Sequence, residues 1–274
     1  MAEPLDVVVP AHHKDFDTLE HCVRSVARHV AGVRRICVVA DQPFSSREKL
    51  VEWVAEPEPP VLPGIAEIRS QWEREAPENA GRAPWVFQQL LKLGAKEFVD
   101  GLSQRYLVVD SDVIFLRAVS FAGPRFPYSR STELNPPYAE SYRRLIGEDQ
   151  PGDQSYTAHH MLYDQGFLGE LFDEIGSRHG KSWAQAYVDA VDFTEPNSIN
   201  EQDTYAHWVI SRHPEDAVHR QLRWRDSNFV PGLFARATLS LDYDFVAAHA
   251  YRRESKAQRL KHVLARIRDE VTAR

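Results

Sequence analysis

The first 112 residues alternate short apolar runs with segments of helical periodicity, and this alternation constrains the fold more than any other feature. Four apolar runs are predicted to be strands, over residues 5–10, 36–40, 65–68 and 106–109. The segments between them are predicted to be helices, over residues 15–31, 47–54 and 84–100. Continuous apolar strands separated by helices predict an α/β fold, with a mostly parallel central sheet flanked by helices on both faces.

The second half of the chain is less regular. Residues 124–157 contain many prolines, glycines and aromatic residues, and are predicted to form loops. Helices are predicted over 166–179 and 200–212, and a strand over 239–245. Residues 252–274 are predicted to form a C-terminal basic amphipathic helix that packs on the same domain, which spans 1–251.

The composition excludes several classes of protein. A chain of 274 residues can bury a substantial core without disulfides, and its two cysteines, Cys22 and Cys37, have neither a disulfide framework nor zinc spacing. The net charge of −7 argues against nucleic acid as a partner. Neither a signal peptide nor a membrane-spanning run is visible, so we expect a cytoplasmic protein. Residues 252–274, with eight Lys/Arg and three Asp/Glu, could make peripheral contact with an anionic membrane, although a solvated basic face is the simpler interpretation.

Two carboxylates follow the fourth predicted strand. Asp110 and Asp112 come directly after four apolar residues. In an extended backbone, residues two apart point to the same side, so both carboxylates are expected together at the rim of the sheet. Like charges there repel unless a cation neutralises them, and Mn²⁺ or Mg²⁺ suits oxygen ligands. The triplet predicts a metal site, and the alternative is a solvated turn.

Three strand-end motifs together resemble the pattern of GT-A glycosyltransferases. They are Val7-Val8-Val9-Pro10-Ala11-His12, Val38-Val39-Ala40-Asp41 and Val108-Val109-Asp110-Ser111-Asp112. The helix that begins at Trp85, together with segments 158–161 and 200–205, is similar to an uncharacterised bacterial group of DxD-containing proteins, DUF6492. The resemblance implies a GT-A-like (Rossmann-like) fold, with a nucleotide-binding half at 1–112 and an irregular acceptor and donor-sugar half at 113–251.

The same resemblance implies an activity and a set of substrates. The expected activity is metal-dependent transfer of a hexose-type sugar from a nucleoside-diphosphate sugar to a hydroxyl acceptor. UDP-sugar is the expected donor, and the acceptor is a glycan or a small-molecule glycoside. The expected cofactor is Mn²⁺ or Mg²⁺.

Roles carried over from the resemblance concern the nucleotide and the metal. Pro10, Ala11 and His12 would border the nucleobase, Asp41 would contact the base or ribose, and Asp110 and Ser111 would lie near the ribose. Asp110 and Asp112 would bind the metal. Asp41 is explained equally well as a turn residue before Gln-Pro.

His249 lies late in the chain, where several GT-A families have a further metal ligand. The alternative for His249 is a satisfied histidine in the core. Arg252 and Lys256, which follow it, could neutralise the departing diphosphate.

Glu201 and Asp203 open a predicted helix, where acidic residues complement the helix dipole. One of them could instead be the base that takes the proton of the acceptor hydroxyl in an inverting transfer, and Asp203 is slightly preferred. Four further residues are candidates for sugar or acceptor contacts: Trp85, Gln88, His159 and His160. Core packing is the preferred explanation for Trp85, and adjacent histidines in an extended backbone would face opposite ways.

Two other functions fit parts of the pattern. A sugar-phosphate nucleotidyltransferase also combines carboxylates, metal and a parallel sheet, but the segment after the first strand contains no glycine-rich phosphate loop. A catalytically inactive carbohydrate- or nucleotide-binding homologue is the remaining alternative. The intact Asp110 and Asp112 pair favours the enzyme.

Overall fold

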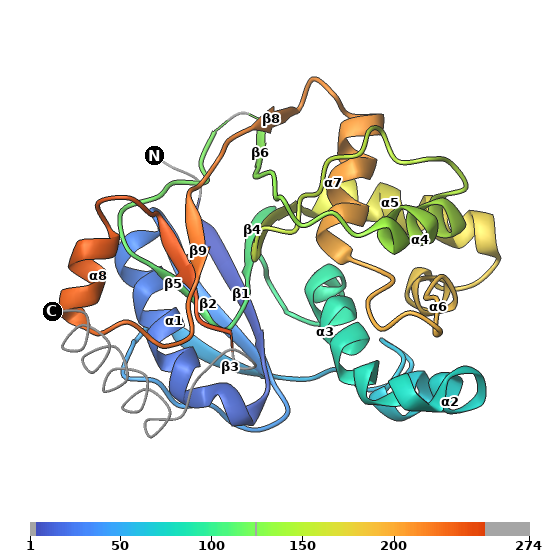
Figure 1. The fold of residues 1–274 in the computed structure, drawn as a ribbon, viewed down its shortest axis with the longest axis horizontal. Coiled ribbons are helices and arrows are strands. Elements are labelled where there is room, and N and C mark those ends of the chain that lie inside the picture. The colour runs from blue at the N-terminus through green and yellow to red at the C-terminus, as the bar shows by residue number, and fades with distance from the viewer. Residues whose placement is uncertain (1–3, 124, 250–274) are drawn as a thin grey trace, which may run out of the picture.

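The computed structural model of the chain describes residues 4–123 and 125–249, and its centre is a five-stranded sheet of order β3-β2-β1-β4-β7 (Figure 1). These strands are β1 (Leu5–Ala11), β2 (Val33–Ala40), β3 (Val51–Ala55), β4 (Arg105–Val109) and β7 (His160–Asp164). Neighbours among β1 to β4 pair in parallel, and β7 pairs antiparallel with β4 at the edge. The structure is therefore a mixed α/β fold with a mostly parallel central sheet flanked by helices, as predicted.

Two helices cover the sheet on either side in Figure 1. α1 (Phe16–His29) packs against β2, and α3 (Ala83–Leu93) packs against β1. α1 is helical because its buried residues Leu19, Cys22, Val23 and Val26 recur at intervals of three and four, which puts them on one face. Since both strands are apolar on both faces, a helix on each side excludes water from the sheet.

The remaining helices, apart from α8 (Leu233–Leu239), lie together on the right of Figure 1. They are α2 (Ile65–Glu75), α4 (Pro136–Ile146), α5 (Gln165–His179), α6 (Trp183–Asp189) and α7 (Glu201–Arg212). α4, α5 and α7 pack on one another, and α7 also contacts α3, whereas α8 lies apart beside α1. Within the described part of the chain, no helix combines the length and the apolar character needed to cross a bilayer.

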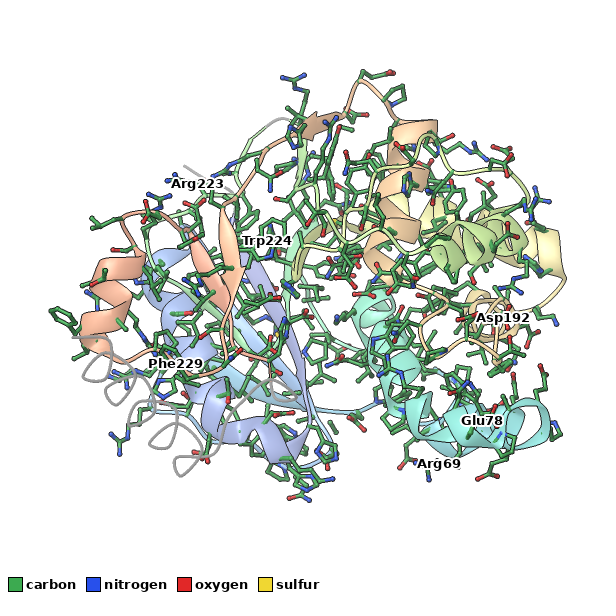
Figure 2. All side chains as sticks on the ribbon, viewed as in Figure 1. Arg69, Glu78, Asp192, Arg223, Trp224 and Phe229 are labelled. Atoms are coloured by element: carbon green, nitrogen blue, oxygen red, sulfur yellow. The ribbon has the colours of Figure 1, made fainter. Side chains whose placement is uncertain are left out.

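A second, three-stranded sheet brings the late part of the chain back to the end of β4. Its strands are β5 (Val113–Phe115), β10 (Phe245–Ala247) and β9 (Trp224–Asp226), and Figure 2 labels Trp224 at the start of β9. β6 (Phe126–Tyr128) pairs separately with β8 (Ala217–His219). β10 runs antiparallel to β5, with Ala247 opposite Val113. The N–H of Ala248 then donates to the carbonyl of Asp112 at 2.9 Å. This pairing fixes residue 249 beside the Asp110–Asp112 turn.

Several predicted elements were wrong. Residues 47–54 do not form a helix, because Val51–Ala55 adds to β2 as a strand. Residues 65–68 begin helix α2 instead of forming a strand, because Ile68 and Trp72, one turn apart, are both buried. Of the strand predicted over 239–245, only Phe245 is extended, within β10.

Helix α4 lies inside the region predicted to be loops. Its two prolines occupy the first turn, where the missing N–H groups have no helical partner to lose. The predicted helix over 252–274 lies outside the described residues.

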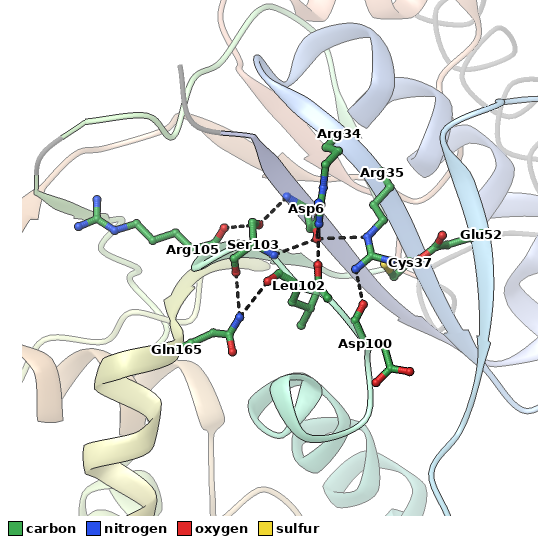
Figure 3. A network of polar contacts seen from close by, with 11 residues as sticks. Asp6, Arg34, Arg35, Cys37, Glu52, Asp100, Leu102, Ser103, Arg105 and Gln165 are labelled. Atoms are coloured by element: carbon green, nitrogen blue, oxygen red, sulfur yellow. Dashed lines mark hydrogen bonds and ion pairs between the residues drawn. The ribbon is translucent and has the colours of Figure 1, made fainter. Parts of the chain in front are cut away.

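Asp6 is a buried carboxylate in an otherwise apolar strand, and it ties the amino-terminal ends of the strands together (Figure 3). It accepts hydrogen bonds from Nε of Arg34 at 2.7 Å and from Nε of Arg35 at 3.2 Å. The N–H of Ser103 donates to the same carboxylate at 3.0 Å. Burial by itself raises the pKa of Asp6, but these donors outweigh it and hold the pKa below its ordinary value.

We expect Asp6→Asn to lower the free energy of unfolding by about 2–3 kcal/mol, since Arg34 loses its ionic partner and Arg35 keeps only Glu52. Because the folded pKa is depressed, this stabilisation is present above about pH 4 and is lost as the pH falls through the folded pKa. Urea unfolding at pH 7 and at pH 3 measures both effects. Glu52→Gln is the matched control, since Glu52 pairs with Arg35 at the exposed surface and should matter by less than about 1 kcal/mol. Equal loss in the two variants would contradict the assignment.

Candidate active site

Asp110 and Asp112 lie in a turn between β4 and β5, at the carboxyl end of the parallel sheet. The N–H of Val113 donates to the carbonyl of Asp110 at 3.1 Å, so the expected extended backbone between the two aspartates was wrong. Both carboxylates nevertheless reach the same group of side chains, because partners approach from two other segments.

Five side chains form what we term the carboxylate–histidine cluster: Asp110, Asp112, His159, Asp226 and His249. Nδ1 of His159 lies 3.2 Å from Oδ2 of Asp110, and Nδ1 of His249 lies 3.0 Å from Oδ2 of Asp112. Nε2 of His249 lies 3.3 Å from Oδ1 of Asp226, and the two imidazole rings are 5.0 Å apart. Ligand atoms of His159, Asp226 and His249 all lie within 4.8 Å of one another.

The backbone places each member of this cluster. β9 and β10 pair in parallel, which brings Asp226 beside the segment that ends in His249. His159 has φ 60, and it is the one residue other than glycine with positive φ among the described residues. Such a conformation is sparsely populated and persists where the surrounding structure imposes it. Here the carbonyl of His159 accepts the N–H of Asp110 at 3.0 Å, which holds the histidine against the turn.

Lys92 supplies a buried ammonium on the other side of Asp110. Its Nζ lies 2.6 Å from Oδ1 of Asp110 and 3.0 Å from Oε1 of Glu201. Burial by itself lowers the pKa of Lys92, but the two carboxylates outweigh burial and raise it. Burial likewise raises the pKa of Asp110, and Lys92 and His159 more than reverse this, so its pKa is lowered. Lys92 is thus held cationic and Asp110 anionic.

The side chains of the site carry a net negative charge that a cation could balance. Asp110, Asp112, Glu201 and Asp226 contribute four carboxylates and Lys92 one ammonium, which gives −3 when the histidines are neutral. Oδ1 of Asp112 is buried and has no hydrogen-bond donor within residues 4–123 and 125–249. A buried anionic oxygen without a donor is costly unless a cation binds it. Carboxylate and imidazole donors fit a divalent ion, and the imidazoles favour Mn²⁺ over Mg²⁺, which prefers oxygen ligands alone.

A cavity of about 1200 Å³ opens beside the carboxylate–histidine cluster. Trp85, Gln88 and Lys92 line it from α3, at spacings of three and four that place them on one face of the helix. Gln89 is buried on another face and accepts the hydroxyl of Tyr187 at 2.7 Å. The wall also includes Tyr138, Asn200, Gln202 and Trp224. A cavity of this size accommodates a ligand as large as a nucleotide sugar.

The two acidic residues at the start of α7 face different ways. Glu201 lines the cavity, whereas the carboxylate of Asp203 accepts the N–H of Tyr156 at 2.5 Å and the hydroxyl of Ser155 at 3.2 Å. The helix is capped by Asn200, whose Oδ1 accepts the N–H of Asp203 at 2.9 Å. Asp203, the slightly preferred base, is therefore directed toward the segment at 155–156 and does not line the cavity.

His160 also lies away from the cavity. It is buried between Phe121 and Phe245, and its Nδ1 lies 2.7 Å from the carbonyl of Ala158. Burial lowers the pKa of His160 to about 4. The structure thus separates the two adjacent histidines, with His159 at the site and His160 in the core.

The predicted nucleobase residues lie at the ends of β1 and β2. Pro10 and Ala11 are buried in β1, whereas His12 is exposed, and the imidazole of His13 lies 2.5 Å from Oδ2 of Asp41. Burial raises the pKa of Asp41, but hydrogen bonds from His13 outweigh it and lower that pKa. Ser111 lies within the turn between Asp110 and Asp112. Arg252 and Lys256 lie outside the described residues.

Three residues of the site were missed in the sequence. The sequence did contain a signal for Lys92: it is a charged residue among Leu90, Leu91 and Leu93, and it lies four residues after Gln88, on the same face of the helix. His13 and Asp226 had no such signal, because each reaches its partners only through strand pairing or a turn. A mostly parallel sheet with acidic and imidazole groups and a large cavity beside its carboxyl ends is the arrangement in which α/β proteins commonly bind their ligands.

Comparisons with known proteins give one family and distant structural similarity. The chain belongs to the family described as "Family of unknown function (DUF6492)", which matches residues 3–197. A search of curated proteins gives no match. The galactosyltransferase LgtC, in complex with donor and acceptor sugar analogues, is 13% identical with a TM-score of 0.48, over 89% of this chain and 86% of its own. Mouse xyloside xylosyltransferase 1 in its apo form is 11% identical with a TM-score of 0.42, over 92% of this chain and 100% of its own.

We expect Lys92→Met to lower the free energy of unfolding by about 3 kcal/mol, because it leaves two buried carboxylates without their cation. Adding Glu201→Gln removes one of those charges and should recover part of the loss. Urea unfolding of both variants in the presence of a chelator measures the effect. Wild-type stability of Lys92→Met would contradict a stabilising role for this ion pair.

Asp203 should make the fold more stable at low pH than at high pH. Burial raises the pKa of Asp203 to about 7, against hydrogen bonds that lower it. A raised carboxyl pKa contributes stability that is full below about pH 4 and is lost as the pH rises through 7. The difference in unfolding free energy between Asp203→Asn and wild type should therefore grow in favour of the variant from pH 4 to pH 8. Asp189→Asn, at an exposed position, is the control and should follow the pH dependence of wild type. If the unfolding free energy of Asp203→Asn also runs parallel to that of wild type from pH 4 to pH 8, the prediction is refuted.

Proposed function

We propose that the chain is a metal-dependent glycosyltransferase of the GT-A type, moving a sugar from a nucleoside-diphosphate sugar to a hydroxyl acceptor. The observation that carries the proposal is Asp112: its Oδ1 is buried without a donor among the described residues, and its Oδ2 contacts His249, which lines a large cavity. This arrangement suits a cation that also binds a ligand. The strand-end motifs that resemble GT-A enzymes supply the rest of the argument.

Asp110, Asp112 and His249 would hold the ion, Mn²⁺ or Mg²⁺, with Asp226 and His159 beside it. When bound, the ion supplies Lewis-acid stabilisation of the diphosphate leaving group. His249 must be neutral to bind a metal, and its contacts with Asp112 and Asp226 orient the ring.

The cavity would hold the sugar and the acceptor. We assign Trp85, Gln88 and His159 to contacts with the sugar or the acceptor, because all three side chains line the cavity. Glu201 is the carboxylate of the α7 pair that faces this space, so we assign it the role of accepting the acceptor proton. Its ion pair with Lys92 would orient Glu201 toward the cavity. Asp203 would act as a positioning residue that holds the segment at 155–156.

The nucleotide would lie along the ends of β1, β2 and β4. In this proposal Pro10, Ala11 and His12 border the base, and Asp41, oriented by His13, contacts the base or ribose. Asp110 and Ser111 lie toward the ribose. Uridine is the proposed base, and Arg252 and Lys256 are assigned to the diphosphate on sequence grounds.

We expect UDP with Mn²⁺ to raise the melting temperature more than ADP with Mn²⁺, since a ligand that binds only the folded state stabilises it. Asp112→Asn should lower the calorimetric affinity for UDP with Mn²⁺ at least tenfold. Without metal, its melting temperature should stay close to that of wild type, because the change removes a carboxylate that has a donor-less buried oxygen among the described residues but also loses the ionic contact with His249.

His249→Ala should weaken Mn²⁺ binding in the same assay, and the exposed His219→Ala should leave it unchanged. Unchanged UDP affinity in Asp112→Asn would reject the metal assignment, and equal stabilisation by ADP and UDP would reject uridine. Slow Mn²⁺-dependent hydrolysis of UDP-sugar by wild type, lost in Asp112→Asn, would distinguish a transferase from an inactive binding homologue.

A further inference from the structure

Helix α8 carries an apolar face that points into solvent. Leu233 is 84% exposed, Phe234 is 87% exposed, and Leu241, just beyond the helix, is 74% exposed. No other large apolar side chain in the described ranges is exposed to this extent. Scattered apolar residues are ordinary on a protein surface, but a contiguous group of large ones marks a surface that binds something.

The core does not require this face. The opposite side of α8 is anchored through Leu239, which packs with Val230 and Tyr243 on a small buried cluster that includes Ile114 and Val246. Leu233 and Ala237 are one helical turn apart and both are exposed, with Phe234 beside them. The helix is therefore held on one side and presents leucine and phenylalanine on the other.

Arginines from two helices lie close to this face. Arg24 and Arg28 are exposed one turn apart on α1, and Arg236 lies on α8. None of the three has an ion pair with a carboxylate in the portion of the chain described. α8 lies beside α1 (Figure 1), and besides burial the charges of Arg236 and Arg24 lower the pKa of His21.

Arginine charges also act on a second histidine further along α1. Burial and then the charges of Arg28 and Arg236 lower the pKa of His29. The acidic residues of this helix, Asp17 and Glu20, lie toward its other end, where Glu20 accepts the hydroxyl of Ser46 at 2.7 Å. Asp242 is exposed and directly follows Leu241, so the three arginines and this aspartate give the neighbourhood a net charge of +2, although the whole chain has a net charge of −7.

We propose that this face docks onto an anionic lipid surface. The apolar side chains would enter the boundary between headgroups and acyl chains, and the arginines would meet lipid phosphates and carboxylates. Residues 252–274 carry a net charge of +5, which would add to the attraction for anionic lipid. The proposal does not depend on sugar transfer.

The test is co-sedimentation of the full-length protein with vesicles of phosphatidylcholine, with or without 30% phosphatidylserine. We expect binding to the anionic vesicles only, weakening as salt is raised. The double substitution of Leu233→Ser and Phe234→Ser should weaken binding at least tenfold, because both side chains leave water on docking. The paired change of Arg24→Gln and Arg28→Gln should weaken it as well.

Leu134→Ser is the matched control, since Leu134 is an exposed leucine elsewhere on the surface, and it should bind as wild type does. The melting temperature of the double serine variant should equal that of wild type. A fall of several degrees would mean that the chain itself covers the face, and loss of a dimer in that variant would mean that a second copy covers it. Either result, or unchanged sedimentation of the double variant, would overturn the proposal.

Discussion

The arrangement of the site depends on one buried ammonium. Lys92 of α3 lies between Asp110, at the end of β4, and Glu201, at the start of α7, and so joins the parallel sheet to the helical half of the molecule. An ion pair in the interior stabilises only if each charge keeps its partners, because desolvation costs several kcal/mol per ion. The three elements must therefore keep their relative positions for the fold to tolerate these charges. The same ion pairs hold one wall of the cavity in place.

The other wall depends on backbone pairing. β5 continues directly from the Asp110–Asp112 turn, and β10 returns from more than a hundred residues later to pair with it. β9 then adds on the far side of β10. Because this sheet holds His249 and Asp226 through main-chain bonds, their positions do not rely on long flexible side chains. The cluster is thus built from rigid elements, which is what precise placement of ligand groups requires.

The sequence allowed the parallel core to be predicted, because β1, β2 and β4 are short, continuously apolar and separated by a helix with one apolar face. The position of Asp110 and Asp112 at a strand end followed from the same pattern. Edge strand β3 was missed because it is half-exposed and short, and α2 because Ile65 and Ile68 alone suit a strand as well as a helix. The separation of His159 from His160 depends on a positive φ, which a histidine adopts only under tertiary constraint.

Two aspartates, Asp6 on β1 and Asp112 in the turn between β4 and β5, show how differently two carboxylates of one fold can be surrounded. Asp6 has two arginines and a backbone N–H on its carboxylate, so its charge is satisfied within the protein. Asp112 has a histidine on one oxygen, and the described residues offer no donor to the other. The first aspartate lies at the amino-terminal ends of the strands and the second beside their carboxyl ends. Because buried charges are normally satisfied within a folded protein, the Asp112 oxygen that has no donor among the described residues is the observation on which the proposed cation site rests.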